Sequence, residues 1–149
     1  MPSHKTPNAT SPEASLIFPF AEPPRWGELQ EVAAGILWTR MPLPFRIGHV
    51  NIYFIDDGDG WAVLDTGMAG EPTRLIWESL LKGPLAGQRL TRLIVSHAHA
   101  DHVGLAGWLC KCRDMPLLMT LGGYLGCLSY LRDPDARAAQ RRIVISSHG

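Results

Sequence analysis

The sequence predicts an α/β (or α+β) fold in which helices flank a mixed sheet. Three observations support this class. Runs of β-branched and aromatic residues occupy the front of the chain, which is typical of a strand meander. From residue 71 onward, helical and strand patterns alternate, which is typical of helices packed on a sheet. The length of 149 residues allows one ordinary domain and excludes a second.

Residues 1–24 are expected to form a disordered tail, which leaves residues 25–149 for the domain. Six of the 12 prolines lie in these first 24 residues, among several serines and threonines. Such a composition cannot bury enough apolar surface to offset the entropy lost on ordering. The folded part is therefore about 125 residues long, which is enough for one hydrophobic core.

Three strands are expected in the first half of the domain, over residues 35–40, 50–56 and 61–65. Pro42, Pro44 and Gly48 separate the first two runs. The second and third are joined by the sequence Asp-Gly-Asp-Gly at 57–60, where glycine supplies the positive φ of a tight turn. The second and third strands are therefore expected to form a hairpin.

The second half alternates helices and strands. Glu71-Pro72 opens a helix that carries Leu75, Ile76 and Leu80 as an apolar stripe and ends at Gly83-Pro84. The remaining predicted elements are a strand at 90–96, a helix at 103–113, a strand at 116–119, helices at 121–131 and 133–142, and a final strand at 143–146. The uncharged run 115–131 is interpreted as a buried strand followed by a core helix, because it is short and interrupted by glycine.

Charge and cysteine content exclude several kinds of partner. The 14 basic and 14 acidic residues balance, so neither a nucleic-acid surface nor a polybasic membrane surface is expected. Cys110, Cys112 and Cys127 are too few and too clustered for a secreted disulfide framework. No cleaved signal peptide is expected, because the apolar run at 16–20 is short and interrupted by Pro19. A cytoplasmic protein is therefore expected.

Three of the six histidines fall within residues 97–102, together with Asp101. In an extended segment His97 and His99 point the same way and can bind one cation, while Asp101 and His102 can serve a second. Imidazole nitrogen with carboxylate oxygen suits zinc, with iron or manganese as substitutes. A water bridging two such ions would lose a proton near neutral pH and become a nucleophile. The alternative, solvated loop histidines beside a helix-capping aspartate, explains less of the pattern.

The sequence from His97 to His102 resembles the H-x-H-x-D-H signature of the metallo-β-lactamase fold hydrolases. Asp65-Thr66-Gly67 is similar to the D-T-G that this family places after an earlier strand. Asn51 in the preceding strand and the continuation His102-Val103-Gly104 are similar too. The resemblance covers about residues 35–149.

The resemblance implies an αββα sandwich with two zinc ions at one edge, of which this chain would form the first half. It implies that His97 and His99 bind the first metal and that Asp101 and His102 bind the second. It also implies that Asp101 orients or deprotonates the attacking water. Asp65 would hold a ligand histidine through a hydrogen bond; a simple turn-capping role is the open alternative.

The resemblance also implies further metal ligands from later strands. The candidates after His102 are Asp114, which is interpreted as a turn residue, Asp133 and Asp135, which flank a proline at a helix start, and His148 near the chain end. None matches the family pattern. We therefore expect an apparently truncated domain with two protein ligands per metal, and exposed apolar surface that favours aggregation or dimerisation.

The function expected from the resemblance is zinc-dependent hydrolysis of a small ester or thioester, as in enzymes of the glyoxalase II kind. The alternative is a catalytically inactive fragment that binds metal weakly. Trp61, Trp77 and Trp108 are expected in packing roles. The pair Cys110 and Cys112 lies at i and i+2 of a helix, where the side chains point apart, so no metal or redox role is expected of it.

Overall fold

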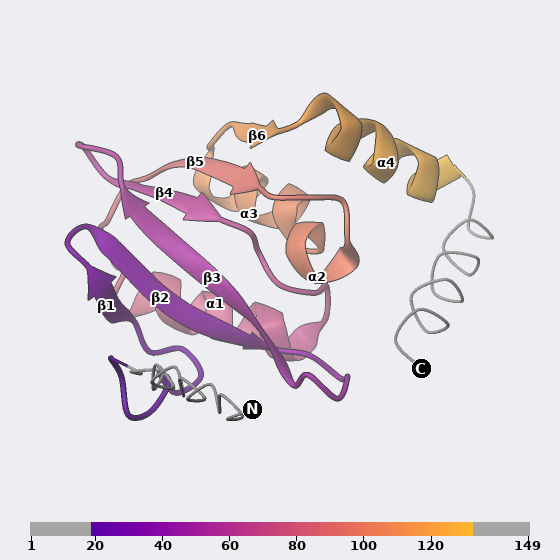
Figure 1. The fold of residues 1–149 in the computed structure, drawn as a ribbon. Helices are drawn as coiled ribbons and strands as arrows, with labels where there is room; N and C mark the ends of the chain where they lie inside the picture. The colour runs from indigo at the N-terminus through magenta and orange to yellow at the C-terminus, as the bar shows by residue number, and fades with distance from the viewer. Residues whose placement is uncertain (1–18, 133–149) are drawn as a thin grey trace, which may run out of the picture.

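The computed structural model describes residues 19–132, and these form a six-stranded sheet with helices (Figure 1). The strands follow one another across the sheet in chain order. Their bounds are β1 Gln30–Ala33, β2 Ile36–Pro42, β3 His49–Asp56, β4 Trp61–Leu64, β5 Leu90–Val95 and β6 Leu117–Met119. The helices are α1 Glu71–Lys82, α2 Ala100–Val103, α3 Ala106–Arg113 and α4 Leu121–Arg132.

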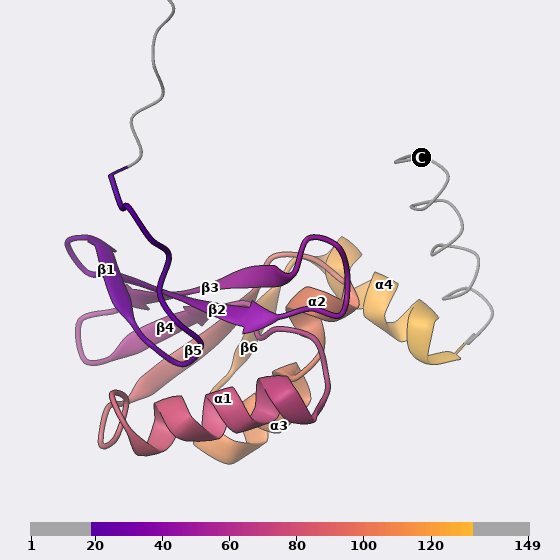
Figure 2. The same ribbon diagram turned by 90° about the horizontal axis from the view of Figure 1, so that it is seen from below.

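The sheet is mixed because two kinds of connection build it. Short connections join each of the strands β1, β2, β3 and β4 to the next, so these neighbouring strands pair antiparallel. Helical crossovers join β4 to β5 and β5 to β6, so these pairs are parallel. Helices α1 and α3 of the two crossovers both lie on the same face of the sheet (Figure 2). The predicted fold class, a mixed sheet with flanking helices, is confirmed.

The hydrophobic core lies between that face of the sheet and α1 and α3. Alternate residues of β3 point into it, and Phe54 packs edge-on against Trp77 of α1 with ring centroids 5.8 Å apart. The rest of the fully buried core comes from β2, β3, β4, β5, α1 and α3 and includes Met41, Ile52, Val63, Leu80, Leu93 and Leu109. The end of β5 is part of this core, since Leu93 and Val95 are buried in it.

Three differences from the predicted elements have identifiable causes. Strand β1 was not predicted, because Gln30–Ala33 is short and half polar and forms a strand only by pairing with β2. Strand β2 continues through Pro42, which pairs opposite His49 at the end of the strand. The prediction that Leu75 belongs to the apolar stripe of α1 is wrong: its side chain is 57% exposed, and Trp77 occupies the buried face instead.

The region from β6 onward differs most from the prediction of a buried strand and a core helix. Helix α4 contains no buried residue, and β6 is largely exposed. The exposed large apolar residues of this region are Leu117, Leu118, Leu121, Tyr124, Leu125 and Leu131. These side chains are 40–73% exposed within the described residues, where β6 is the last strand of the sheet.

The ends of the chain lie partly outside the described residues. This holds for the helix expected at 133–142, the strand expected at 143–146 and most of the expected tail. Pro24, at the end of that tail, is buried, and its carbonyl accepts a hydrogen bond from Arg40 Nε at 2.9 Å. No helix in the described part of the chain is long and apolar enough to cross a bilayer.

Candidate metal centre

The parallel pairing of β4 and β5 brings the two sequence motifs together. Leu64 lies opposite Ile94, and Asp65 N–H donates to the Ile94 carbonyl at 2.8 Å. Both strands end within two residues of this pair, so Asp65 and the segment beginning at Ser96 leave the sheet at the same edge. In Figure 1 this edge faces α2. Carboxyl ends of parallel strands are where α/β folds form their sites.

Asp65 is the centre of a hydrogen-bond cluster at this edge. Its backbone has a positive φ of 66°, and the residue is only 5% exposed. Ser96 N–H donates to Oδ1 at 2.8 Å, while Ser96 Oγ and His102 Nδ1 each lie 2.8 Å from Oδ2. Burial raises the pKa of Asp65, but the hydrogen bonds from His102 and Ser96 outweigh burial and hold that pKa below its usual value. Asp65 is therefore ionised and accepts only.

The ring of His97 lies against the rings of both other histidines of the motif. The ring centroid of His97 is 4.5 Å from that of His99 and 4.0 Å from that of His102. His102 Nε2 lies 3.4 Å from Asp101 Oδ2. All four side chains are at least partly accessible. The motif thus places three imidazoles and one carboxylate at the surface of one sheet edge.

The protonation of two of these rings is biased in opposite directions. The hydrogen bond to Asp65 raises the pKa of His102 above its usual value of 6.5, against the opposing effect of burial. Burial, together with the nearby His102 and His99, lowers the pKa of His97. His97 is therefore neutral at neutral pH, which is the form that can bind a metal.

Thr66 ties this cluster to the start of α2. Its N–H and its hydroxyl both donate to the His102 carbonyl, at 2.9 and 2.8 Å, and its hydroxyl accepts from Leu105 N–H at 3.0 Å. These bonds occupy a carbonyl and an amide that a continuous helix would use. The single helix predicted at 103–113 is therefore wrong: it is split into α2 and α3 at Gly104 and Leu105.

Two glycines allow the D-T-G segment to pack closely against its neighbours, Gly104 on the side of α2 and Gly67 on the side of α1 and β2. A Cβ at Gly104 would lie 2.4 Å from Ala69 N and 2.8 Å from the Gly67 carbonyl. Gly67 has φ +85°, and a Cβ there would lie 2.8 Å from Thr73 Cγ2 and 3.0 Å from Met41 Cβ. Both positions exclude a side chain because neighbouring atoms already occupy the space.

The donor side chains are of the right chemical type for a divalent metal, but too few of them come together among the described residues to hold one ion. Imidazole and carboxylate are ligands of zinc and its first-row neighbours. Within residues 19–132, however, no three His, Cys, Asp or Glu side chains form a group that could hold one metal ion. The described residues therefore supply pairs of donors, and a three-ligand site requires donors from elsewhere.

Other residues considered in the sequence do not join the cluster. Asp114 is the left-handed C-cap of α3, as expected of a turn residue. Asp133, Asp135 and His148 lie outside the described residues. Cys110, Cys112 and Cys127 are free. Asn51 accepts a hydrogen bond from Trp38 Nε1 at 2.9 Å across the β2–β3 pair.

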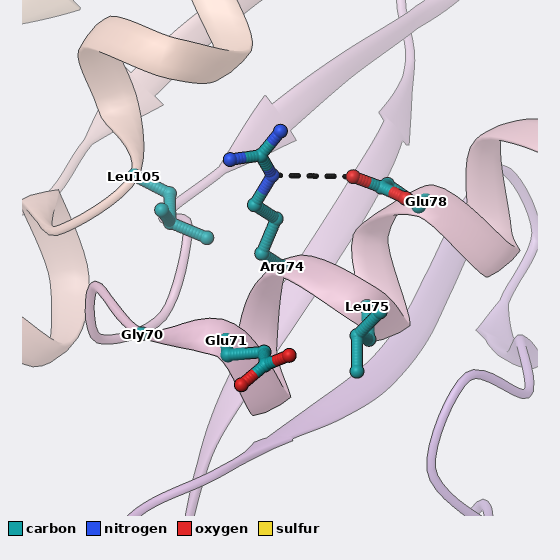
Figure 3. A pocket seen from close by; sticks show the side chains of 6 residues that line it. All are labelled: Gly70, Glu71, Arg74, Leu75, Glu78 and Leu105. Atoms are coloured by element: carbon teal, nitrogen blue, oxygen red, sulfur yellow. Dashed lines mark hydrogen bonds and ion pairs between the residues drawn. The ribbon is translucent and has the colours of Figure 1, made fainter.

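A separate hollow of about 560 Å³ lies beside α1 and contains none of the motif histidines. Its lining includes the Arg74–Glu78 ion pair and Leu105 (Figure 3). The exposed Leu75 also lines it, which is where this side chain lies instead of in the core. The hollow therefore shares only the α2–α3 connection with the metal centre.

Sequence reasoning missed two residues of the cluster, Ser96 and Thr66. The sequence places Ser96 only at the end of a strand, and Thr66 only within a motif. A signal for Ser96 exists: it follows a buried strand and precedes His97, so its hydroxyl must emerge at the ligand edge. For Thr66 the partners, His102 and Leu105, lie more than 35 residues away, so no local pattern reveals them.

Comparison with known proteins agrees with this architecture. The family model described as the metallo-beta-lactamase superfamily matches residues 46–123, just over half of the chain. A curated Bacillus subtilis (strain 168) protein, named probable metallo-hydrolase YqjP, is 31% identical over 71 residues. That match covers 47% of this chain and 22% of the relative.

Solved structures show the same fold. The crystal structure of a beta-lactamase domain protein from Burkholderia ambifaria is 43% identical, covers 74% of this chain and 36% of its own, and has a TM-score of 0.69. A metallo-beta-lactamase family protein from Thermus thermophilus is 22% identical, with a TM-score of 0.61 over 80% of this chain and 40% of its own. The chain thus spans well under half the length of these relatives. On its sequence and its partial fold, the chain belongs to the metallo-beta-lactamase superfamily.

Proposed function

We propose that this chain carries part of the metal centre of a hydrolase that acts on a small ester or thioester. The observation that carries the proposal is the meeting of three imidazoles, with ring centroids 4.0 and 4.5 Å from that of His97, at a sheet edge organised by Asp65. Superfamily membership and a relative named probable metallo-hydrolase support the reaction class.

In this proposal His97 and His99 bind a first metal, and Asp101 and His102 bind a second. Zinc is the proposed metal, with iron or manganese as substitutes. A metal held there supplies Lewis acidity, which makes water nucleophilic at neutral pH and stabilises developing negative charge on a carbonyl oxygen. Asp101 accepts a proton from the attacking water or orients it. Asp65 fixes the ring direction and tautomer of His102 through the 2.8 Å hydrogen bond to Nδ1.

The test combines metal content with turnover. The purified chain is loaded with Zn²⁺, dialysed and analysed for zinc per chain, and then assayed with a small thioester and a phosphodiester. We expect bound zinc and thioester hydrolysis, both lost in His99→Ala. In Asp101→Asn we expect loss of the second metal and of activity with the fold unchanged. Full activity of Asp101→Asn would show that its role is misassigned.

A second candidate function is that the chain binds metal weakly and does not turn over substrate. The observation that favours it is that no three donor side chains among residues 19–132 form a metal-binding group. A zinc site with two protein ligands binds far more weakly than one with three or four. Zinc that is removed by dialysis, without thioester turnover, would support this candidate over the first.

The proposed partner is a small-molecule substrate, with neither nucleic acid nor membrane involved. The apolar surface of β6 and α4, with Leu121 73% and Leu131 70% exposed, is proposed to favour self-association. A cytoplasmic location is proposed because all three cysteines are free, which fits a reducing compartment.

A further inference from the structure

The hydroxyl of Ser96 touches two members of the candidate site at once. Ser96 Oγ lies 2.8 Å from Asp65 Oδ2 and 2.9 Å from His97 Nδ1. Its distance to His102 Nδ1 is longer, 3.3 Å. Separately, the Ser96 backbone N–H donates to Asp65 Oδ1 at 2.8 Å. One side chain thus links a carboxylate to a candidate metal ligand.

Proton accounting fixes the direction of these bonds. A serine hydroxyl has one proton to donate, and an ionised carboxylate can only accept. The Ser96 proton must therefore point to Asp65 Oδ2. The 2.9 Å contact with His97 then requires the proton to be on His97 Nδ1, with the hydroxyl oxygen accepting. Neutral His97 consequently carries its lone pair on Nε2.

The same carboxylate oxygen fixes His102 in the same way. His102 Nδ1–H donates to Asp65 Oδ2 at 2.8 Å, which leaves Nε2 to face other partners. His99 differs, because no hydrogen bond to its ring is present within residues 19–132. Asp65 therefore controls His102 directly and can control His97 only through Ser96.

We infer that Ser96 is a positioning residue that joins His97 to the carboxylate orienting His102, so that both rings present an Nε2 lone pair to the metals. This rests on the proposed function only in its reference to metals, since the tautomers are a property of the metal-free chain. The backbone bond from Ser96 to Asp65 Oδ1 does not involve the hydroxyl, so we expect it to remain in Ser96→Ala. The carboxylate therefore stays in place, and loss of the hydroxyl acts on His97.

The first test measures ring tautomers in the wild-type, metal-free chain. Long-range ¹H–¹⁵N spectra of the ¹⁵N-histidine-labelled protein at pH 7.5 distinguish Nδ1–H from Nε2–H imidazoles, and single His→Gln variants assign the signals. We expect His97 and His102 to be Nδ1–H. A wild-type His97 that is mainly Nε2–H overturns the inference, and this measurement does not depend on the folding of any serine variant.

The second test compares Ser96→Ala with Ser96→Thr, which keeps a hydroxyl, and with Ser79→Ala, an exposed serine on α1. In Ser96→Ala we expect His97 to lose its Nδ1–H preference while His102 keeps it. Zinc affinity, measured by competition with a chromophoric chelator, should fall by about 10- to 100-fold. Ser96→Thr should restore both readouts, and Ser79→Ala should change neither.

The outcomes separate this inference from the proposed function. An unchanged His97 tautomer in Ser96→Ala, or unchanged zinc affinity in a wild type that binds zinc, overturns the role of Ser96. If the wild-type chain binds no zinc, the proposed metal centre fails, while the two tautomer measurements still decide whether Ser96 positions His97.

Discussion

Thr39 and Thr66 offer a matched pair in which one substitution should have opposite effects. Both side chains are completely buried. Thr66 Oγ1 donates to the His102 carbonyl at 2.8 Å and accepts from Leu105 N–H at 3.0 Å. Thr39 Oγ1 has no hydrogen-bond partner among the described residues. Threonine and valine have nearly the same shape, so Thr→Val at either position changes the hydroxyl and little else.

The sign and size of each effect follow from these partners. Thr66→Val removes a donor from the His102 carbonyl and leaves the Leu105 amide unpaired, which should lower the free energy of unfolding by about 1–3 kcal/mol. Thr39→Val removes a buried hydroxyl that makes no hydrogen bond among the described residues, and valine is favoured in strands. This change should raise the free energy of unfolding by about 1–2 kcal/mol.

Urea unfolding followed by tryptophan fluorescence measures the difference. With an m-value of about 1–2 kcal/mol per M, the midpoints of the two variants should lie roughly 1–5 M apart, on opposite sides of the wild type. Thr66→Ser keeps the hydroxyl, so its free energy of unfolding should fall less than that of Thr66→Val. Thr39→Ser keeps the unpaired hydroxyl and loses the methyl group, so it should be less stable than the wild type. A Thr39→Val variant as destabilised as Thr66→Val would refute the assignment of stability to hydrogen-bond partners.

Three further outcomes are expected. Gly67→Ala should destabilise the fold by about 2–5 kcal/mol in urea titrations, since φ is +85° and a Cβ would meet Thr73 Cγ2 at 2.8 Å; Gly58→Ala, with the same φ and no atom within 4 Å, should cost only about 1–2 kcal/mol. In the metal-free chain, the raised pKa of His102 contributes stability that is complete below pH 6.5 and is lost as the pH rises through the higher folded pKa. The lowered pKa of Asp65 contributes stability that is present above pH 3.8 and is lost as the pH falls through the lower folded pKa. Asp65→Asn should abolish both dependences in stability measured from pH 3 to 9, and an alkaline loss that persists in this variant would assign it to another group. Finally, Leu125→Gln, at a site 54% exposed on α4, should reduce self-association in sedimentation velocity, whereas Leu75→Gln, 57% exposed on α1, should not; equal effects would place the contact elsewhere.

Much of the fold could be predicted from sequence because its signals are local. The bounds of α1 are those expected from Glu71-Pro72 and Gly83-Pro84. The β3–β4 hairpin forms with the glycine turn that was expected, in which Asp57 N–H donates to the Gly60 carbonyl at 2.9 Å. Periodicity failed where a distant partner decided the outcome. The hydrogen bonds of Thr66 to His102 and Leu105 divide the helix predicted at 103–113. Residues 30–33 form strand β1 because they pair with β2.

The candidate site shows the same division. The motif at 97–102 indicates the candidate donor groups by itself, because the imidazole and carboxylate donors follow directly from the residue types. The sequence left two roles open for Asp65, a turn cap or a partner of a ligand histidine. The 2.8 Å bond to His102 Nδ1 shows contact with a candidate ligand, and this contact requires residues 37 positions apart to meet.

The sequence by itself determined the family and the class of fold, and it supplied the candidate metal-binding side chains, since each depends on residue type and short-range spacing. Only the tertiary structure decided how those side chains are held. The parallel register of β4 and β5 places Asp65 beside Ser96, and the bonds from Thr66 set where α2 ends. Hydrogen bonds between segments require their atoms to approach within a few tenths of an ångström of the right distance. Strand pairing and the absence of side chains at Gly67 and Gly104 control that approach, and no local sequence pattern encodes it.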